Sequence, residues 1–359
     1  MYIIRLRPLF ISVLLVGLMF FLWGFTEDLQ SDTETTLESL RTQNNTENRP
    51  HIILGYVTDW SMDIPDPYSV SHLAYAFATI NDDYTTLNIK KEERFRQIVN
   101  LKDSNPCLKV LLSIGGWGAG NFSEMASTEE NRSQFIKNAM YIQRQYGIDG
   151  FDIDWEFPGS SLGKISSTKN DKTNFTKLIR QFRDSLGNSG ILTFASPSNG
   201  KFYEYDSISP YVDFVNVMAY DMGTPPRHHS PLNHSALTGR LSVKDVIANH
   251  YKQGVPVGKI VLGVPFYGRG NKSEYKNFQD YRGIKILPNT EKRFDSIAYA
   301  PYIADSTTGE LLLTYDDSIS VKAKCELIKE IGAGGIMFWH YGGDTKDHTL
   351  LRTIHSILK

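Results

Sequence analysis

The sequence has few cysteines, little net charge and no recognisable metal-ligand spacing. Its two cysteines, Cys107 and Cys325, lie far apart in the chain, so no disulfide framework is indicated and a large core has to stabilise the fold. With 38 basic and 40 acidic residues, the formal net charge is -2, which provides no electrostatic case for binding nucleic acid. His228, His229 and His234 form a loose loop cluster, which we interpret as solvated. We therefore expect neither a metal nor a cofactor.

The N-terminal segment differs from the rest of the chain. Arg5 and Arg7 precede an uncharged run, residues 9–25, after which acidic residues follow. This charge asymmetry predicts that the N-terminus stays in the cytoplasm and that the remainder lies across the membrane. The run is long for a signal-peptide core, short for a membrane span and lacks a convincing small-residue cleavage site. Residues 1–26 are thus a signal peptide or an N-terminal membrane anchor, and we favour an uncleaved anchor.

Two further regions follow this segment. Residues 27–50 are rich in Thr, Glu, Asn and Gln and contain few apolar residues, which predicts a flexible linker. Residues 51–359 alternate apolar and polar stretches and are long enough to bury a large core. We expect this region to form one folded domain outside the cytoplasm and to act as a monomer.

Short apolar runs alternate with amphipathic helical patterns throughout residues 51–359. Eight runs read as strands, at residues 51–57, 72–78, 109–113, 150–154, 192–196, 214–220, 260–264 and 335–339. Amphipathic stretches lie between several of them, at residues 128–146, 172–186, 243–253 and 321–331. This order predicts a (β/α)8 barrel, whose usual size is about 250 residues plus insertions. A doubly wound open sheet is the alternative, but no Gly-x-Gly-x-x-Gly follows the first strand.

The fourth predicted strand carries the most informative segment, Asp149–Glu156, which reads Asp-Gly-Phe-Asp-Ile-Asp-Trp-Glu. Because side chains alternate along a strand, Asp152, Asp154 and Glu156 share one face and the apolar residues share the other. Repulsion and burial both disfavour ionisation, so at least one carboxyl should keep a proton near neutral pH and serve as a general acid. A calcium loop or a solvated edge strand is the alternative, but neither explains the apolar face.

The ends of the other predicted strands carry aromatic and polar residues. Active sites of (β/α)8 barrels lie at the C-terminal ends of the strands. Aromatic rings stack on the apolar faces of sugars, so rings beside carboxylates indicate a sugar cleft. Each ring alone is more typical of a core position than of a ligand contact, but their recurrence at strand ends favours the cleft. The candidates at these ends are Tyr56, Phe77, Trp117, Met218, Tyr220, Asp221, Tyr267, Arg269 and Trp339.

From residue 51 to its end, the chain resembles glycoside hydrolase family 18, the chitinases and their relatives. The resemblance rests on three motifs in the right order and strands: Ser113-x-Gly115-Gly116, Asp149-x-x-Asp152-x-Asp154-x-Glu156 and Met218-x-Tyr220-Asp221. It implies a retaining, substrate-assisted hydrolysis in which the sugar's own N-acetyl group replaces an enzyme nucleophile.

Catalytic roles follow from this resemblance. Glu156 would protonate the glycosidic oxygen, and Asp154 would orient the acetamide and stabilise its developing positive charge. Asp152 would share a proton with Asp154, and Tyr220 would hydrogen-bond the acetamide oxygen. The two glycines, Gly115 and Gly116, carry no chemistry and are expected to let the third strand pass close to the fourth.

Binding roles follow from it as well. Trp339 would form the floor of the subsite before the cleavage point, and Trp117 would stack a sugar on the leaving-group side. The subsite of Trp339 would also be lined by Tyr56, Phe77, Met218 and Asp221. From the seventh strand, Tyr267 and Arg269 would reach the sugar chain.

A short α+β insertion is expected between the seventh strand and the last helix, at residues 270–317, with strand-like runs at 283–287 and 311–315. Relatives with a tunnel-like cleft have a larger subdomain here, so the resemblance implies a lower wall and internal cuts in the substrate. An equal alternative is that the segment only packs the barrel rim.

The expected partner is chitin or a chitooligosaccharide, cut between its β-1,4-linked N-acetylglucosamine units. An endo-β-N-acetylglucosaminidase acting on the core of N-glycans is an alternative, because it uses the same acid and acetamide. A non-catalytic sugar-binding protein is a third possibility. Such relatives typically lack the terminal glutamate of the acidic motif, whereas Glu156 is present.

Overall fold

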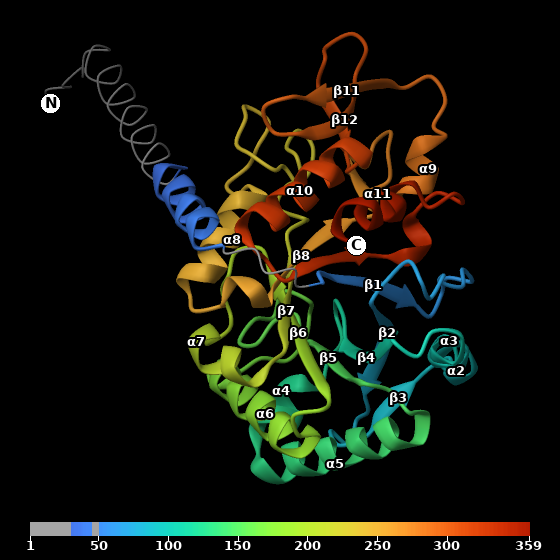
Figure 1. The fold of residues 1–359 in the computed structure, drawn as a ribbon, viewed down its shortest axis with the longest axis vertical. Coiled ribbons are helices and arrows are strands. Elements are labelled where there is room, and N and C mark those ends of the chain that lie inside the picture. Colours follow the sequence, from blue (N-terminus) through green and yellow to red (C-terminus); the bar gives the residue numbers. More distant parts are fainter. Residues whose placement is uncertain (1–29, 45–49) are drawn as a thin grey trace, which may run out of the picture.

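Eight parallel strands close into a barrel in the computed structural model, which describes residues 30–44 and 50–359 (Figure 1). The barrel strands are β1 (Ile52–Thr58), β2 (His72–Ile80), β4 (Lys109–Gly115), β5 (Gly150–Asp154), β6 (Ile191–Pro197), β7 (Phe214–Met218), β8 (Ile260–Pro265) and β14 (Gly335–Trp339). Strand β1 pairs with both β2 and β14, which closes the sheet. A short strand, β3 (Leu87–Ile89), pairs antiparallel with β2. The (β/α)8 prediction and its eight strands are confirmed.

Helices surround the barrel on its outer side (Figure 1). The four predicted helices are present as α5 (Glu129–Tyr146), α6 (Asp171–Leu186), α8 (Val243–Lys252) and α10 (Ser318–Ile331). Helices not predicted from the sequence are mostly short: α2 (Glu92–Val99), α3 (Leu101–Ser104), α4 (Phe122–Ser127), α7 (Tyr205–Ile208) and α11 (Thr349–Leu358). Segments of one or two turns are too short to establish a helical period in the sequence.

Alternation along β5 separates its two faces as expected. Phe151, Ile153 and Trp155 point outward into the layer between the barrel and the helices, where they are fully buried. Trp155, for example, stacks on Phe122 of α4 with a centroid distance of 5.3 Å. The acidic face therefore points into the barrel.

The insertion between β8 and α10 forms a second, antiparallel sheet. Its strands are β9 (Tyr267–Gly270), β10 (Gln279–Asp280), β11 (Glu291–Asp295), β12 (Ala300–Ala304) and β13 (Leu311–Thr314), in the order β10-β9-β13-β12-β11. The strand expected at 311–315 is confirmed. The strand expected at 283–287 is wrong, because this segment belongs largely to helix α9 (Tyr281–Lys285). Tyr281 and Ile284 are buried three positions apart, which is a helical spacing.

The expected flexible linker, residues 27–50, is corrected by the structure over most of its length. Residues 30–43 are helical and pack against the outside of the barrel beside α8 (Figure 1), and we call this segment the N-terminal helix. Leu37 and Leu40 are 0% and 1% exposed and belong to the main core cluster. Two buried leucines among polar residues were too weak a signal to predict this contact from the sequence.

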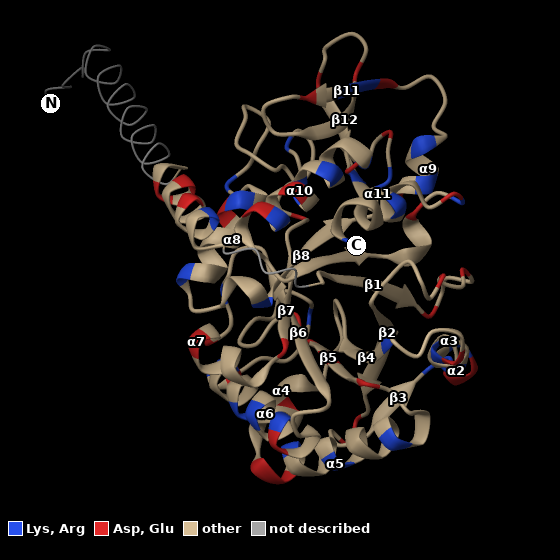
Figure 2. Ribbon diagram, viewed as in Figure 1, with Lys and Arg blue, Asp and Glu red and all other residues tan. Residues whose placement is uncertain are grey.

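Polar contacts extend the docking of the N-terminal helix. The Thr33 hydroxyl donates to Asp245 Oδ1 of α8 at 2.9 Å. Lys244 of α8 pairs with Glu34 at 2.7 Å, and Arg41 pairs with Glu330 of α10 at 3.3 Å. Figure 2 shows the charged residues of this helix close to those of α8 and α10. Exposed pairs of this kind each contribute little, roughly 0–1 kcal/mol, so the two leucines dominate the contact.

The apolar run at residues 9–25 lies outside the described residues. Within residues 30–44 and 50–359, no helix combines the length and the apolar character that crossing a bilayer requires.

Replacing Leu37 and Leu40 with alanine should release the N-terminal helix from the barrel. Buried Leu→Ala substitutions each destabilise by about 2–5 kcal/mol, so the free-energy difference that favours the docked helix over the undocked one should fall sharply. Limited trypsin digestion should then cleave after Arg41 at least ten times faster than in the parent protein. The matched control is Thr35→Ala with Ser39→Ala on the exposed face of the same helix. Equal cleavage rates in both double variants would contradict the docking.

Candidate active site

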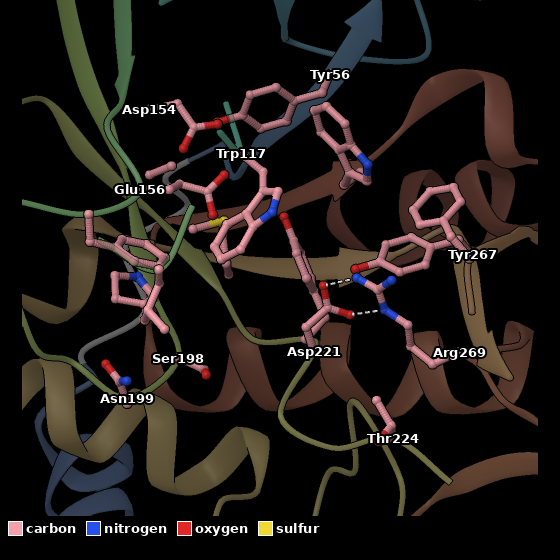
Figure 3. A pocket seen from close by; sticks show the side chains of 18 of the residues that line it. Tyr56, Trp117, Asp154, Glu156, Ser198, Asn199, Asp221, Thr224, Tyr267 and Arg269 are labelled. Carbon is pink, nitrogen blue, oxygen red and sulfur yellow. Dashed lines mark hydrogen bonds and ion pairs between the residues drawn. The ribbon is translucent and has the colours of Figure 1, made fainter. Parts of the chain in front are cut away.

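A cleft of about 700 Å³ opens at the C-terminal ends of the barrel strands (Figure 3). This volume falls within the range of about 300–1,000 Å³ that is common for ligand pockets. Eleven of the twelve residues predicted for the site line it: Tyr56, Phe77, Trp117, Asp154, Glu156, Met218, Tyr220, Asp221, Tyr267, Arg269 and Trp339. The twelfth, Asp152, lies below the cleft inside the barrel and is fully buried.

Asp152 accepts hydrogen bonds from four other strands of the barrel. Tyr56 Oη and Ser113 Oγ donate to its Oδ2 at 2.8 and 2.7 Å. Thr193 Oγ1 and Asn216 Nδ2 donate to its Oδ1 at 2.7 and 3.0 Å. Both oxygens are thus fully engaged, and the described residues include no hydrogen bond between Asp152 and Asp154. The proton sharing expected between these two residues stays a prediction.

Asp154 and Glu156 follow Asp152 toward the cleft, and both have raised pKa values. Burial, followed by the charges of Glu156 and Asp152, raises the pKa of Asp154 well above its ordinary value. Burial, followed by the charge of Asp221, raises the pKa of Glu156 to about 8. Asp154 Oδ1 is buried and has no hydrogen-bond partner among the described residues. Burial and mutual repulsion therefore favour the protonated form of both acids near neutral pH, and Asp154 Oδ1 is a buried oxygen that no described residue bonds.

Glycines at the end of β4 make room for this arrangement. A Cβ atom on Gly115 would lie 2.1 Å from the backbone oxygen of Asp154, and one on Gly116 would lie 2.6 Å from the Phe77 ring. Their φ angles, +122° and +92°, also favour glycine. The expected close passage of the third barrel strand beside the fourth is confirmed.

Asp221 is held as an anion by Arg269, as Figure 3 shows, and by His229. Arg269 forms a bidentate pair with it, with Nε at 2.6 Å from Oδ1, and His229 Nδ1 lies 3.5 Å from the same oxygen. Burial by itself would raise the pKa of Asp221, but the hydrogen bonds from His229 and Arg269 outweigh it and keep the pKa well below its ordinary value. Arg269, expected to reach the sugar chain, is thus engaged with Asp221, and it lies on β9 rather than on a barrel strand.

The interpretation of the histidine cluster as solvated is wrong for two of its members. His228 and His229 are both fully buried. His228 contacts Asp295 and Thr314, each at 3.3 Å. No group of three or more His, Cys, Asp or Glu residues with metal-ligand geometry occurs in the part of the chain that the structure describes.

Aromatic rings form one wall and the rim of the cleft. Trp339 stacks against Phe77 with a centroid distance of 5.4 Å and an interplanar angle of 19°, and Tyr56 lies at 5.5 Å from Trp339. Trp117 stands at the rim and is 64% exposed. The Tyr220 hydroxyl has one contact among the described residues, with Met337 Sδ at 4.0 Å, so its proton is available to a ligand.

Several lining residues were not identified from the sequence. They fall into two groups, one at the end of β6 and in the loops after β5, β6 and β7, and one in the insertion: Phe157, Leu162, Ala195, Pro197, Ser198, Asn199 and Thr224 in the first, and Asn277 and Phe278 in the second. The strand-end rule could have found the first group. The second group gave no sequence signal, because the fold of the insertion alone places it. Since its residues line the cleft, the insertion does more than pack the barrel rim.

Comparison with known proteins gives a consistent result. Residues 52–344 match the family model described as glycosyl hydrolases family 18. Chitotriosidase-1 of Mus musculus is 31% identical over 338 residues, covering 79% of this chain and 71% of its own length. Chitinase A1 of Niallia circulans is 29% identical over 395 residues, covering 81% of this chain; the match spans 56% of that longer relative.

Solved structures agree with these sequence matches. A family 18 N-acetylglucosaminidase from Paenibacillus barengoltzii superposes with a TM-score of 0.76 and 30% identity, covering 85% of this chain and 99% of its own. The Ostrinia furnacalis Group IV chitinase, in complex with allosamidin, gives a TM-score of 0.77 and 26% identity, with coverages of 86% and 98%. The N-terminal helix precedes the matched family region.

Replacing Asp221 with asparagine should lower the pKa of Glu156 below its value of about 8. The substitution removes a nearby negative charge and leaves Arg269 without its partner, and both changes favour ionised Glu156. Carbon-13 NMR titration of the glutamate carboxyls checks this, with Glu156→Gln identifying the resonance. Asp305→Asn, in the β12–β13 turn, is the control. A Glu156 titration unchanged by Asp221→Asn would show that Asp221 exerts no charge effect there.

Proposed function

Because the chain belongs to glycosyl hydrolases family 18, we propose that it hydrolyses β-1,4 bonds between N-acetylglucosamine units of chitin or chitooligosaccharides, with retention of anomeric configuration. The observation that carries this proposal is the pairing of two carboxyl groups in the cleft. Glu156, with a pKa of about 8, can donate a proton, and the unpartnered oxygen of Asp154 can accept a hydrogen bond from the N–H of a substrate amide.

In the first step, Glu156 protonates the glycosidic oxygen as the bond to the anomeric carbon breaks. The carbonyl oxygen of the sugar's own acetamide attacks that carbon, which yields an oxazolinium ion and a leaving alcohol. In the second step, Glu156, now a carboxylate, takes a proton from water, and the hydroxyl opens the oxazolinium ion from the side the leaving group vacated. This substrate-assisted route is the recognised exception to the two-carboxylate rule of glycosidases. Activity should fall at alkaline pH as Glu156 loses its proton.

Three neighbours of Glu156 would hold the acetamide for this attack. Asp154 Oδ1, buried and without a partner, would accept the acetamide N–H and stabilise its developing positive charge. The Tyr220 hydroxyl would donate to the acetamide oxygen, since its one contact in the described structure is a weak one to sulfur. Asp152, whose oxygens accept four hydrogen bonds, would fix the strand that carries the other acids and share a proton with Asp154. A group positioned in this way contributes proximity catalysis.

The aromatic residues would bind the sugar rings on both sides of the scissile bond. Trp339, braced by Phe77 and Tyr56, would stack the sugar whose acetamide reacts. Trp117, exposed at the rim, would stack a sugar on the leaving-group side. Met218, Asp221 and Tyr267 complete the lining, and Arg269 acts on the substrate through Asp221.

A second candidate substrate pattern comes from the comparisons. The Paenibacillus barengoltzii structure is that of an N-acetylglucosaminidase, so release of single sugars from chain ends has to be tested beside cleavage within chains. A non-catalytic sugar-binding role is disfavoured because Glu156 is present and its carboxyl faces the cleft (Figure 3).

We further propose that the barrel acts outside the cytoplasm, with residues 1–26 as a signal peptide or membrane anchor, on the strength of their charge pattern.

Glu156→Gln should lower turnover of chitooligosaccharides by at least about 10²-fold while binding is retained, because an amide keeps the shape but cannot supply the proton. Steady-state kinetics measure the first quantity, and calorimetric titration with chitohexaose measures the second. Glu130→Gln, an exposed position on α5, is the matched control. Turnover within a few fold of the parent enzyme would remove Glu156 from the role of acid.

Fully N-acetylated hexamer should be cleaved with retention, while the corresponding glucosamine hexamer should be cleaved at least about 10²-fold more slowly, because it lacks the nucleophile. A thiazoline mimic of the oxazolinium ion should inhibit competitively. Inversion, or equal rates on both hexamers, would refute substrate assistance.

The kind of substrate is tested on the same oligosaccharides. Mass spectrometry of the products distinguishes internal from terminal cleavage, and a high-mannose glycopeptide in parallel tests for N-glycan hydrolysis.

A further inference from the structure

The turn after β7 carries two residues of the cleft, Tyr220 and Asp221, and its backbone is under constraint. Strand pairing holds β7 up to Met218, whose last partner is Pro197 of β6. Beyond that point the chain leaves the sheet, and Asp221 adopts a φ of +58°, in the left-handed region that side chains rarely occupy. Such conformations persist only where neighbouring contacts enforce them. Arg269 bonds the Asp221 side chain within the cleft, and further contacts from outside the cleft hold the backbone of this turn.

A buried ammonium group stands behind the turn. Lys324 of α10 and Asp316, which precedes that helix, form an ion pair whose side chains are both 0% exposed. Lys324 Nζ also donates to the Ser230 backbone oxygen at 2.8 Å and to Ser230 Oγ at 2.7 Å. An ammonium group has three protons, so all of its donors are used.

Ser230 connects Lys324 to Ala219, the residue before Tyr220. Its hydroxyl donates to the backbone oxygen of Ala219 at 2.7 Å. On the other side of the turn, the Met222 amide donates to the His229 backbone oxygen at 3.0 Å. The segment 219–222 is therefore held from both sides by residues 229 and 230, and Lys324 holds residue 230.

A buried ion pair is a poor source of stability, because desolvation of the two charges offsets much of their attraction. Neutral residues of the same size often stabilise a core equally well. The main effect of this pair is therefore to orient the groups to which Lys324 donates hydrogen bonds. Those bonds lead to the corner that carries Tyr220 and Asp221.

We propose that Lys324 is a positioning residue for the reaction: through Ser230 it fixes the 219–222 turn, and with it the Tyr220 hydroxyl and the Asp221 carboxylate, against the substrate. For its kinetic consequences, this inference rests on the proposed hydrolase function. Lys324 itself lies outside the cleft and does not touch the substrate.

Lys324→Met tests the proposal, with Lys324→Met/Asp316→Asn beside it. In the single variant, kcat should fall about 10- to 100-fold, as small displacements of catalytic groups do, while KM changes less because the Trp339 platform is intact. The alkaline limb of the pH profile should also move to lower pH, because displaced Asp221 no longer disfavours ionisation of Glu156. In the double variant, the buried charge is removed with its partner, so Tm should recover while kcat stays low.

The two readouts separate positioning from stability. Recovery of kcat together with Tm in the double variant would overturn the proposal, as would a parent-like kcat in the folded single variant. Lys322→Met, an exposed lysine on the same helix, is the control and should leave kcat, Tm and the pH profile unchanged. If Lys324→Met does not fold, Ser230→Ala removes the hydroxyl that joins Lys324 to Ala219, keeps the bond from Lys324 to the backbone oxygen of residue 230, and should lower kcat in the same direction.

Amide hydrogen exchange makes the test independent of the proposed function. Peptides covering residues 219–230 should exchange faster in Lys324→Met than in Lys322→Met, whatever the substrate of the protein is. Unchanged exchange there would overturn the positioning role. Faster exchange together with an inactive parent protein on chitooligosaccharides would instead contradict the proposed hydrolase function and leave the structural link intact.

Discussion

Five strands of the barrel meet at one carboxylate, that of Asp152, and the geometry of the cleft depends on this meeting point. Its four donors come from β1, β4, β6 and β7, while Asp152 itself lies on β5. A buried polar group left without its partner costs about 1–3 kcal/mol, so the network strongly favours one arrangement of these strands. Asp154 and Glu156 follow at intervals of two residues, and their positions are therefore set by the same network.

Asp221 and Glu156 lie in different environments, which give the two carboxyl groups different protonation states. Asp221 is ionised because Arg269 and His229 hydrogen-bond to it, whereas burial, followed by the fixed charge of Asp221, raises the pKa of Glu156, which has no cationic partner among the described residues. Neighbouring carboxyls whose pKa values are pushed apart in this way can act as a fixed anion and a proton donor at the same pH. Asp221 thus acts on Glu156 through its charge.

The elements outside the barrel take part in this arrangement. The insertion supplies Arg269 for Asp221 and two lining residues, Asn277 and Phe278. The buried Lys324–Asp316 pair supports the turn that carries Asp221 from behind, and both its members lie where the insertion joins α10. On the far side of α8 and α10 from the cleft, the N-terminal helix packs two leucines into the same core. The catalytic unit is therefore a barrel together with its peripheral elements.

The sequence by itself determined the eight barrel strands, the acidic face of β5 and the eleven cleft-lining residues among the twelve predicted. These follow from local periods and from the rule that barrel sites lie at strand ends. Only the tertiary structure decided the four partners of Asp152, the engagement of Arg269 with Asp221, the burial of His228 and His229, and the helical docking of residues 30–43. Each of these joins residues far apart in the chain. Such contacts leave no periodic trace in the sequence, and short segments take the conformation that their packing partners stabilise.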